Sequence, residues 1–193
     1  MTPRPPLIKA AQELLQFLAA ARRPACLIGG MVVSRWGEPR NTRDVDATIL
    51  TDFGEEAAVL DLLLSRFRSR DPQPAERAAI GRLALLSASN GVDIDVSLAA
   101  FPFELEAIER ASDWRVTRRV SLRTCSAEDL VIYKLVAARL IDLHDVQSVV
   151  SRQGAALDVD RIRLWGRRFS EITERPDLLD PFEAALKKPG RLR

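Results

Sequence analysis

Hydrophobic residues recur along the chain with two different periods, and each period predicts a different kind of element. In residues 7–21 they recur at helical spacing, which predicts an amphipathic helix. Residues 25–29, ACLIG, are a short apolar run typical of a buried strand, and residues 31–36 predict a short helix. Because Gly29 and Gly30 stand between these two elements, the sequence predicts a strand, a tight turn and a helix in succession.

Alternation of polar and apolar side chains predicts further strands. Residues 44–50, DVDATIL, alternate as a half-buried strand does. Residues 82–98 hold two apolar runs around Asn90-Gly91. This pair readily takes the positive φ angles of a tight turn, so we predict a β-hairpin here.

Helical patterns fill most of the remaining chain. Residues 55–67 and 103–111 predict helices, whereas residues 114–122 predict a strand or an extended segment. From Ser126 onward the pattern is helical, with Ser126 and Asp129 at the two ends of a capping box.

The order of these elements predicts an α/β (α+β) fold with an all-helical end. We expect an α/β core over residues 1–125 and a helical region over residues 126–193. The helical region would pack on the core, either as a second domain or as part of a single domain.

Composition narrows the class of protein. The 193 residues are 47% hydrophobic and 29% charged, as in an ordinary globular protein, and the net charge of +2 does not by itself indicate a nucleic-acid binder. With one histidine and only Cys26 and Cys125, we do not expect a zinc site or a disulfide scaffold, and we expect two buried thiols. No apolar run approaches the ~20 residues that span a bilayer, and the start lacks the apolar core of a signal peptide. The sequence predicts a cytoplasmic protein that does not enter a membrane.

Four carboxylates stand at strand spacing. Asp44 and Asp46 are two residues apart, as are Asp93 and Asp95, so each pair projects from one face of its strand. If the two strands were neighbours, the four side chains would share a small volume, where each raises the pKa of the others unless a cation is present. Mg²⁺ is the natural partner, and two such ions suit phosphoryl chemistry.

The glycine pair suggests a phosphate. A glycine turn that enters a helix lets backbone N–H groups approach a polyphosphate, at the positive end of the helix. The segment lacks the Gly-Lys-Ser/Thr of a P-loop and the third glycine of a dinucleotide fingerprint. A different phosphate-binding turn is therefore expected at Gly29 and Gly30.

Taken in order, these features resemble the signature of the DNA polymerase β-like nucleotidyltransferase superfamily, in particular the AbiEii-type toxin nucleotidyltransferases of bacterial toxin-antitoxin systems. The signature reads Gly29-Gly30, then Gly37-x-x-Arg40-x-Thr42-x-Asp44-x-Asp46. Downstream, GVDIDVSL resembles the strand of the third carboxylate, and AEDLVIYKLVAARLIDLHDV resembles the later Lys-x-x-Ala and Arg-x-x-Asp segments. The resemblance covers about residues 25–150, and it departs from the many members that have Gly-Ser in place of the glycine pair.

The resemblance implies a nucleotidyltransferase fold and a role for each matching residue. It implies that Gly29 and Gly30 hold the triphosphate through their backbone and that Asp44 and Asp46 bind both of two Mg²⁺ ions, with Mn²⁺ as an alternative. Asp95 would bind the ion that activates the acceptor hydroxyl. Asp93 shares its face and stays open as an alternative ligand.

The remaining site residues are implied in the same way. Lys134, as a catalytic residue, and Asp142 would contact the nucleotide and complete the site, and Arg40 and Thr42 would line it. The alternative that Lys134 is an ordinary cation on a helix surface remains open. Arg139 and Asp142 are three residues apart, the spacing of a surface ion pair.

The implied activity is an enzyme that moves a nucleoside monophosphate from a nucleoside triphosphate to a hydroxyl of RNA, such as a tRNA end, or of a protein. The enzyme would be a toxin with a cognate antitoxin. An inactive nucleotide-binding or regulatory module with the same fold stays open as the alternative. Two basic clusters could be solvated faces or an RNA track. They are Arg115, Arg118, Arg119 and Arg123, and Arg161, Arg163, Arg167 and Arg168.

Overall fold

The computed structural model describes residues 3–187, which form two compact units. The first unit runs to Met31 and resumes over Asn41–Cys125, and the second holds Val32–Arg40 and the chain from Ser126 onward. The first is built on a mixed sheet with helices, and the second is helical. The predicted α/β class, with a small mixed sheet followed by helices, is confirmed.

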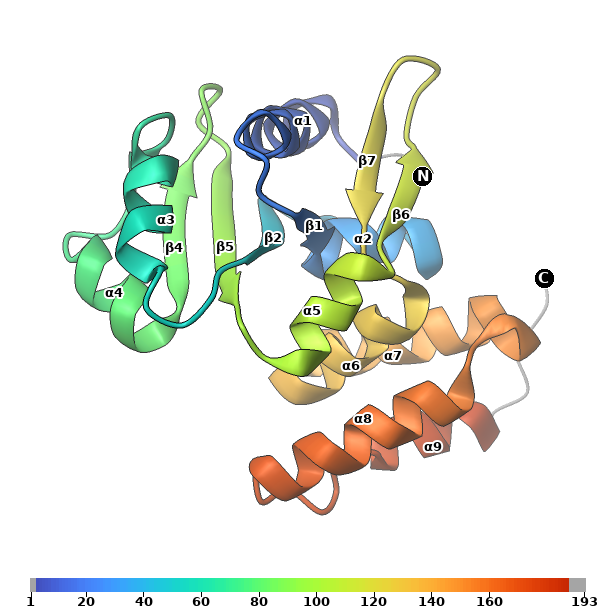
Figure 1. Ribbon diagram of the computed structural model, residues 1–193. Coiled ribbons are helices and arrows are strands. Elements are labelled where there is room, and N and C mark those ends of the chain that lie inside the picture. The colour runs from blue at the N-terminus through green and yellow to red at the C-terminus, as the bar shows by residue number, and fades with distance from the viewer. Residues whose placement is uncertain (1–2, 188–193) are drawn as a thin grey trace. The chain divides into compact units, whose positions relative to one another are not determined.

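Seven strands among the described residues form the sheet of the first unit (Figure 1). In spatial order they are β3 (Arg68–Ser69), β4 (Leu83–Ser87), β5 (Asp93–Ala99), β2 (Asp44–Leu50), β1 (Ala25–Ile28), β7 (Ser121–Thr124) and β6 (Ser112–Arg115). Strands β2 and β5 are parallel, as are β1 and β7, and the other neighbours are antiparallel. The parallel β2–β5 pair lies at the centre and carries the predicted carboxylates.

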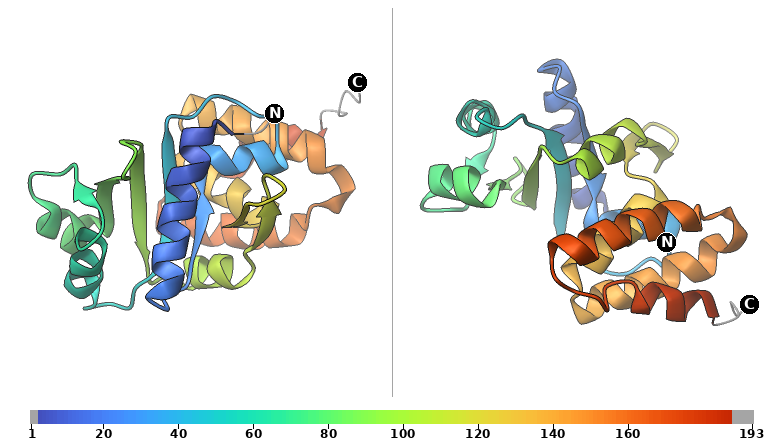
Figure 2. Two further views of the ribbon diagram at one scale, coloured as in Figure 1. Left: turned by 90° about the horizontal axis from the view of Figure 1, so that it is seen from above. Right: turned by 60° about the horizontal axis from the view of Figure 1, so that its bottom comes forward.

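Helices cover both faces of this sheet. The helix α1 (Pro5–Ala20) packs on β1 and β2 through an apolar stripe, as its periodicity predicts, and α5 (Pro102–Glu109) packs on the opposite face (Figures 1 and 2). The Cys26 thiol of β1 lies 4.0 Å from the Ala107 carbonyl oxygen of α5, which identifies the face that α5 covers. Two further helices, α3 (Glu56–Leu64) and α4 (Pro74–Gly81), pack against each other.

The β4–β5 hairpin forms as predicted, but its turn is longer than a two-residue turn. Gly91 has a φ of +78°, whereas Asn90 is not among the residues with positive φ. The Ala88 N–H donates to the Val92 carbonyl, and the Asn90 side chain accepts from the Val92 N–H and donates to the Pro6 carbonyl. Asn90 is therefore selected for its side-chain hydrogen bonds rather than for a left-handed backbone.

A second hairpin differs from the sequence expectation. Residues 114–122, expected as one strand or extended segment, contribute to both β6 and β7, and the chain turns over residues 116–120. The pattern concealed the turn because no glycine, proline or asparagine marks it. The short elements β3 and α4 were also not predicted.

The second unit contains the rest of the helices of residues 3–187. These are most of α2 (Gly29–Trp36), which begins in the first unit, then α6 (Ala127–Ala137), α7 (Leu140–Gln153), a 3₁₀ turn (Gly154–Ala156), α8 (Val159–Ile172) and α9 (Asp180–Lys187). The Ser126 side chain caps α6 by accepting from the Asp129 N–H, as predicted. Ile162, Trp165 and Phe182 are buried, and α6 packs against α8 and α7 against α9 (Figure 2).

Two simpler expectations can be checked against the fold. Cys26 and Cys125 are fully buried free thiols, as predicted. None of the helices described within residues 3–187 is both long and apolar enough to cross a bilayer.

Candidate functional site

The register of β2 and β5 brings the four carboxylates together. Asp44 is paired with Asp93, and Asp46 with Asp95, on parallel neighbouring strands. Paired residues share a face of the sheet, so all four side chains project from the same side. Thr48 continues this face beyond Asp46 and pairs with Cys26, which α5 covers. The carboxylates thus lie at the open end of the face on which α5 packs.

The glycine turn lies directly against one of these carboxylates. Gly29 follows β1, whose last residue, Ile28, is paired with Asp46. A side chain at Gly29 would place its Cβ only 2.0 Å from the Asp46 Oδ2, and Gly29 has a φ of +69°. The Gly30 N–H donates to the same Oδ2 over 3.3 Å. Glycine is therefore required here both by the backbone conformation and by the close approach of Asp46.

Thr42 and Asp44 form a second local contact. The Thr42 hydroxyl donates to the Asp44 Oδ1 over 2.7 Å. Because this bond fixes one carboxylate oxygen, it leaves the other free to face the cluster. The Thr-x-Asp spacing of the sequence thus has a geometric role.

Arg70, which sequence reasoning did not single out, contacts the carboxylates of β5. Its guanidinium forms an ion pair with Asp95 and a second, 3.3 Å long, with Asp93. Burial raises the pKa of Asp95, and the charges of Asp44 and Asp93 raise it further, which together outweigh the lowering by Arg70. Negative charge is therefore concentrated around Asp95 beyond what one arginine neutralises.

This cluster can be tested for its fit to a divalent metal ion. Carboxylate oxygens are the ligands that Mg²⁺ and Mn²⁺ prefer, and Asp44, Asp46 and Asp95 supply three on adjacent strands. Across residues 3–187, however, no three histidine, cysteine or acidic side chains converge closely enough to hold an ion in their present rotamers. The donor chemistry and strand positions fit a hard cation, but the side chains must turn inward to surround it.

The second unit holds a buried network of charges. Lys134 donates to the Asp142 Oδ1 over 2.7 Å and lies 2.9 Å from the Asp145 Oδ2. Arg40 binds Asp145 through two parallel bonds, of 2.7 and 2.8 Å, and Arg139 binds Asp142. Both carboxylates are at most 1% exposed. Three cations thus surround two buried acids, which leaves the network with a net positive charge.

The network rules out two simple readings of its residues, namely that Lys134 is a solvated cation and that Arg139 and Asp142 form an ordinary surface ion pair. Lys134 is 3% exposed, so it is not an ordinary solvated cation, and the Arg139–Asp142 pair has a buried acid. Burial raises the pKa of Asp142, but hydrogen bonds from Arg139 and Lys134 outweigh it, and the pKa lies below its usual value. Arg40 pairs with Asp145, which the sequence analysis did not select as a site residue.

The sequence-predicted residues therefore fall into two groups. The first unit holds Gly29, Gly30, Thr42, Asp44, Asp46 and Asp95, and the second holds Arg40, Lys134 and Asp142. Two participants were missed. Asp145 follows Asp142 by one helical turn, a spacing that could have suggested it. Arg70 carries no local signal, because only the pairing of β3, β4 and β5 places it beside Asp95.

Comparison with known proteins identifies the fold. No protein-family model matches the sequence, and no curated protein matches it. Among solved structures, an antigenic nucleotidyltransferase-like protein from Paracoccidioides brasiliensis is 15% identical, with a TM-score of 0.53 over 97% of each chain. ANT(2'')-Ia, solved with adenylyl-2''-tobramycin, is 14% identical, with a TM-score of 0.57 over 86% of this chain and 98% of that one.

A third structure extends the comparison. The lincosamide antibiotic adenylyltransferase LnuA, bound to lincomycin, is 12% identical, with a TM-score of 0.50 over 77% of this chain and 98% of that one. At such identities the likeness establishes the fold. The chain has the nucleotidyltransferase fold.

Proposed function

We propose that this protein is a metal-dependent nucleotidyltransferase that moves a nucleoside monophosphate from a nucleoside triphosphate to an acceptor hydroxyl. One observation carries the proposal: the β2–β5 register gathers four carboxylates on one sheet face, beside the Gly29-Gly30 turn, in a nucleotidyltransferase fold. A solvated strand face would not need a glycine packed against Asp46. The combination supports a site that binds metal and phosphate.

In this proposal Asp44, Asp46 and Asp95 would hold one or two Mg²⁺ or Mn²⁺ ions. When bound, a divalent ion supplies positive charge to the phosphates and lowers the pKa of a nearby hydroxyl. The acceptor oxygen attacks the α-phosphorus, the bond to the bridging oxygen of the β-phosphate breaks, and pyrophosphate leaves. The carboxylate cluster takes up the hydroxyl proton. Backbone N–H groups of Gly29 and Gly30 would bind the triphosphate.

The second unit has its own candidate residues for nucleotide contact. On the resemblance to the superfamily, Lys134, Asp142 and Arg40 would contact the nucleotide. Their network carries more positive than negative charge, which suits an anionic ligand. Lys134 is held between two buried acids, Asp142 and Asp145, so its position would be fixed when the nucleotide arrives.

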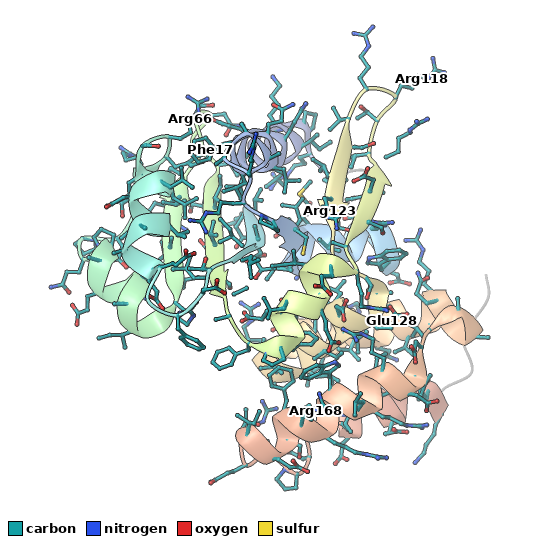
Figure 3. The ribbon with its side chains drawn as sticks, viewed as in Figure 1. Phe17, Arg66, Arg118, Arg123, Glu128 and Arg168 are labelled. Carbon is teal, nitrogen blue, oxygen red and sulfur yellow. The ribbon has the colours of Figure 1, made fainter. Side chains whose placement is uncertain are left out.

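A groove in the first unit supports RNA as the acceptor. A cavity of about 510 Å³ is lined by the end of α1, the start of β1 and the β6–β7 hairpin. Arg22, Arg23 and Arg123 line it, and Arg118 and Arg119 lie exposed on the tip of the same hairpin, where Figure 3 shows Arg118 pointing outward. Within the described chain, no ion pair engages the side chain of Arg22, Arg118 or Arg119. Of these three, only Arg22 lines the groove, where Arg23 is paired with Glu55 and Asp113 adds an acid. Exposed arginines without an ion pair at the groove and on the hairpin tip suit a phosphate backbone.

The groove and the carboxylates lie on opposite faces of the sheet. The groove is lined by α1 and by Ala25, the first residue of β1, whereas the carboxylates project from the face that α5 covers. A long polynucleotide would contact both by passing round an edge of the sheet, whereas a small acceptor would use the carboxylate face alone.

The other basic cluster has a different role. On α8, Arg161 pairs with the buried Asp129, and Arg163 pairs with Glu183 of α9. Arg168 stacks on the Trp165 ring, 4.6 Å from its centroid. Because these arginines already contact residues of their own unit, the cluster on the β6–β7 hairpin is the better candidate for binding an RNA backbone.

We further propose, on the resemblance to AbiEii-type toxins, that the transfer is toxic and that a cognate antitoxin restrains it. Modification of a tRNA end would slow translation and so slow growth. Induced expression of the wild type should therefore slow cell growth, and Asp46→Asn should relieve the effect. Equal toxicity of the two proteins would contradict the catalytic origin of the toxicity.

The decisive experiment follows the α-phosphate. Purified protein with Mg²⁺ receives each α-labelled nucleoside triphosphate together with tRNA, total RNA or protein lysate. Tobramycin and lincomycin serve as small-molecule acceptors, since similar structures were solved with such compounds. We expect label to move into RNA only when a divalent ion is present, and Asp46→Asn to reduce the rate at least about a hundredfold.

The other outcomes separate the alternatives. Label in protein or in an antibiotic would keep the transferase and replace the RNA acceptor. A folded protein that binds nucleotide but labels nothing would favour the inactive binding module. Asp46→Asn should retain the stability of the wild type without metal, since it removes one like charge from the cluster. An unfolded variant would instead show that Asp46 is structural.

A further inference from the structure

Arg70 is attached to the sheet so that its guanidinium reaches the carboxylates. It directly follows β3, and its N–H donates to the Leu85 carbonyl of β4 over 2.9 Å. Leu85 is in turn paired with Asp95 of β5, so Arg70, Leu85 and Asp95 lie in one row across the sheet. The arginine side chain therefore crosses one strand to reach Asp95.

The guanidinium is held by both charged and neutral acceptors. Its Nη2 donates to the Asp95 Oδ1, and its Nε donates to the Leu86 carbonyl over 2.9 Å and lies 3.3 Å from the Asp93 Oδ1. The side chains of Arg70 and Asp95 are 27% and 33% exposed. The ion pair is thus partly shielded from water, which strengthens it, and partly exposed, so that another cation can reach Asp95.

The rest of this segment is fixed. Ser69 and Asp71 bond each other through the serine hydroxyl, and Asp71 pairs with Arg77 at the start of α4. Release of Asp95 therefore needs only a rotation of the Arg70 side chain, without movement of the backbone.

We propose that Arg70 is the resting counter-cation of Asp95 and that a divalent metal ion must displace its guanidinium to complete the metal site. This inference rests on the proposed function, which assigns Asp95 to the metal. It accounts for two observations together: three carboxylates lie on adjacent strands of one face, yet in residues 3–187 no three acidic side chains converge as a ready site. The guanidinium occupies the Asp95 Oδ1 and repels a second cation.

The arrangement has a consequence for the metal-free protein. Without a cation, Asp95 would face the charges of Asp44 and Asp93. Arg70 neutralises part of this charge while the metal is absent, and competes with the metal when it arrives. Metal affinity in the absence of nucleotide is therefore lower than the carboxylates alone would give.

The test measures Mn²⁺ binding directly, by the electron paramagnetic resonance signal of the free ion, on the full chain without nucleotide. Arg70→Gln removes the charge and should tighten binding about tenfold. Arg70→Lys keeps the charge and should bind within about threefold of the wild type. Arg163→Gln, which removes a salt-bridged arginine of the second unit and leaves the Arg70 segment intact, should leave the affinity unchanged.

A double-mutant cycle isolates the contact. In an Asp95→Asn background, Arg70→Gln should no longer tighten Mn²⁺ binding, because the competition is for Asp95. A tenfold gain that persists in this background would overturn the proposal in favour of a general charge effect. Circular dichroism verifies that each variant is folded.

A further variant separates this inference from the function itself. If Arg70→Gln fails to tighten binding while Asp46→Asn weakens it, the role of Arg70 is overturned and the metal centre stands. If Asp46→Asn leaves Mn²⁺ binding unchanged, the carboxylates do not hold the metal, and both proposals are overturned.

Discussion

Replacing Gly29 by alanine tests how closely the glycine turn and the carboxylate strand depend on each other. The added Cβ would lie 2.0 Å from the Asp46 Oδ2 and 2.6 Å from the Asp46 Cβ. Rotation of the aspartate can move its oxygens away but cannot move its Cβ. The overlap therefore forces the end of β1 and the facing residue of β2 apart.

Two contributions lower the free energy of unfolding of Gly29→Ala, and they can be separated. An alanine at the left-handed φ of Gly29 loses about 1–2 kcal/mol. Forcing an atom into an occupied position costs about 1–3 kcal/mol more. We expect Gly29→Ala to lower the free energy of unfolding by roughly 2–5 kcal/mol, and nucleotide transfer to fall sharply because Asp46 is displaced.

Gly91→Ala provides the matched control. Gly91 has a similar φ, +78°, but no atom lies within 4 Å of an added Cβ. It should lose only the conformational part, about 1–2 kcal/mol. Urea unfolding followed by circular dichroism gives both values. If the two variants were equally destabilised, the close packing of Gly29 against Asp46 would be refuted.

Three further predictions concern the second unit. The lowered pKa of Asp142 means that its ionised form stabilises the fold above the unfolded pKa of about 3.9, and that this contribution is lost as the pH falls through the folded value. Asp142→Asn should therefore lower the free energy of unfolding at neutral pH, and this free energy should then fall less as the pH is lowered into the acid range. Urea unfolding at several pH values measures both effects, and an acid dependence equal to that of the wild type would contradict the prediction. Arg40→Gln leaves the buried Asp145 with fewer partners and should lower the free energy of unfolding by about 3 kcal/mol in the same assay. A loss no larger than that of an exposed surface substitution would show that the Arg40–Asp145 pair does not stabilise the fold. Gly37→Ala places a Cβ 2.4 Å from the Ser148 Oγ and should cost about 1–3 kcal/mol, partly recovered by Ser148→Ala; no recovery would contradict the contact.

Gly37, the first residue of the motif Gly37-x-x-Arg40-x-Thr42-x-Asp44-x-Asp46, has a packing role. It belongs to the motif that leads to Arg40 and the carboxylates, yet in the structure it lies against Ser148 and Val149 of α7. The Gly37 carbonyl also accepts from Arg152. Within the motif, this glycine serves helix packing, whereas Asp44 and Asp46 are the residues proposed for the site.

Local pattern alone determined much of the carboxylate strand. The alternation in residues 44–50 predicts β2 with its observed bounds, because a strand has a two-residue period that any half-buried sequence must follow. The same period placed Asp44 and Asp46 on one face. The glycine pair likewise predicted where the chain turns from β1 into a helix, although α2 already begins at Gly29, the residue of the pair with positive φ.

The pairing of strands was decided only by the tertiary structure. Nothing in the local pattern specifies that β2 and β5 run parallel with Asp46 beside Asp95, because register depends on how distant strands bury their other faces together. The arginine that reaches Asp95 and the aspartate that binds Arg40 lie 25 and 105 residues away from their partners. Local periodicity can predict which side of an element a residue occupies, but side chains so far apart meet only when the whole chain packs.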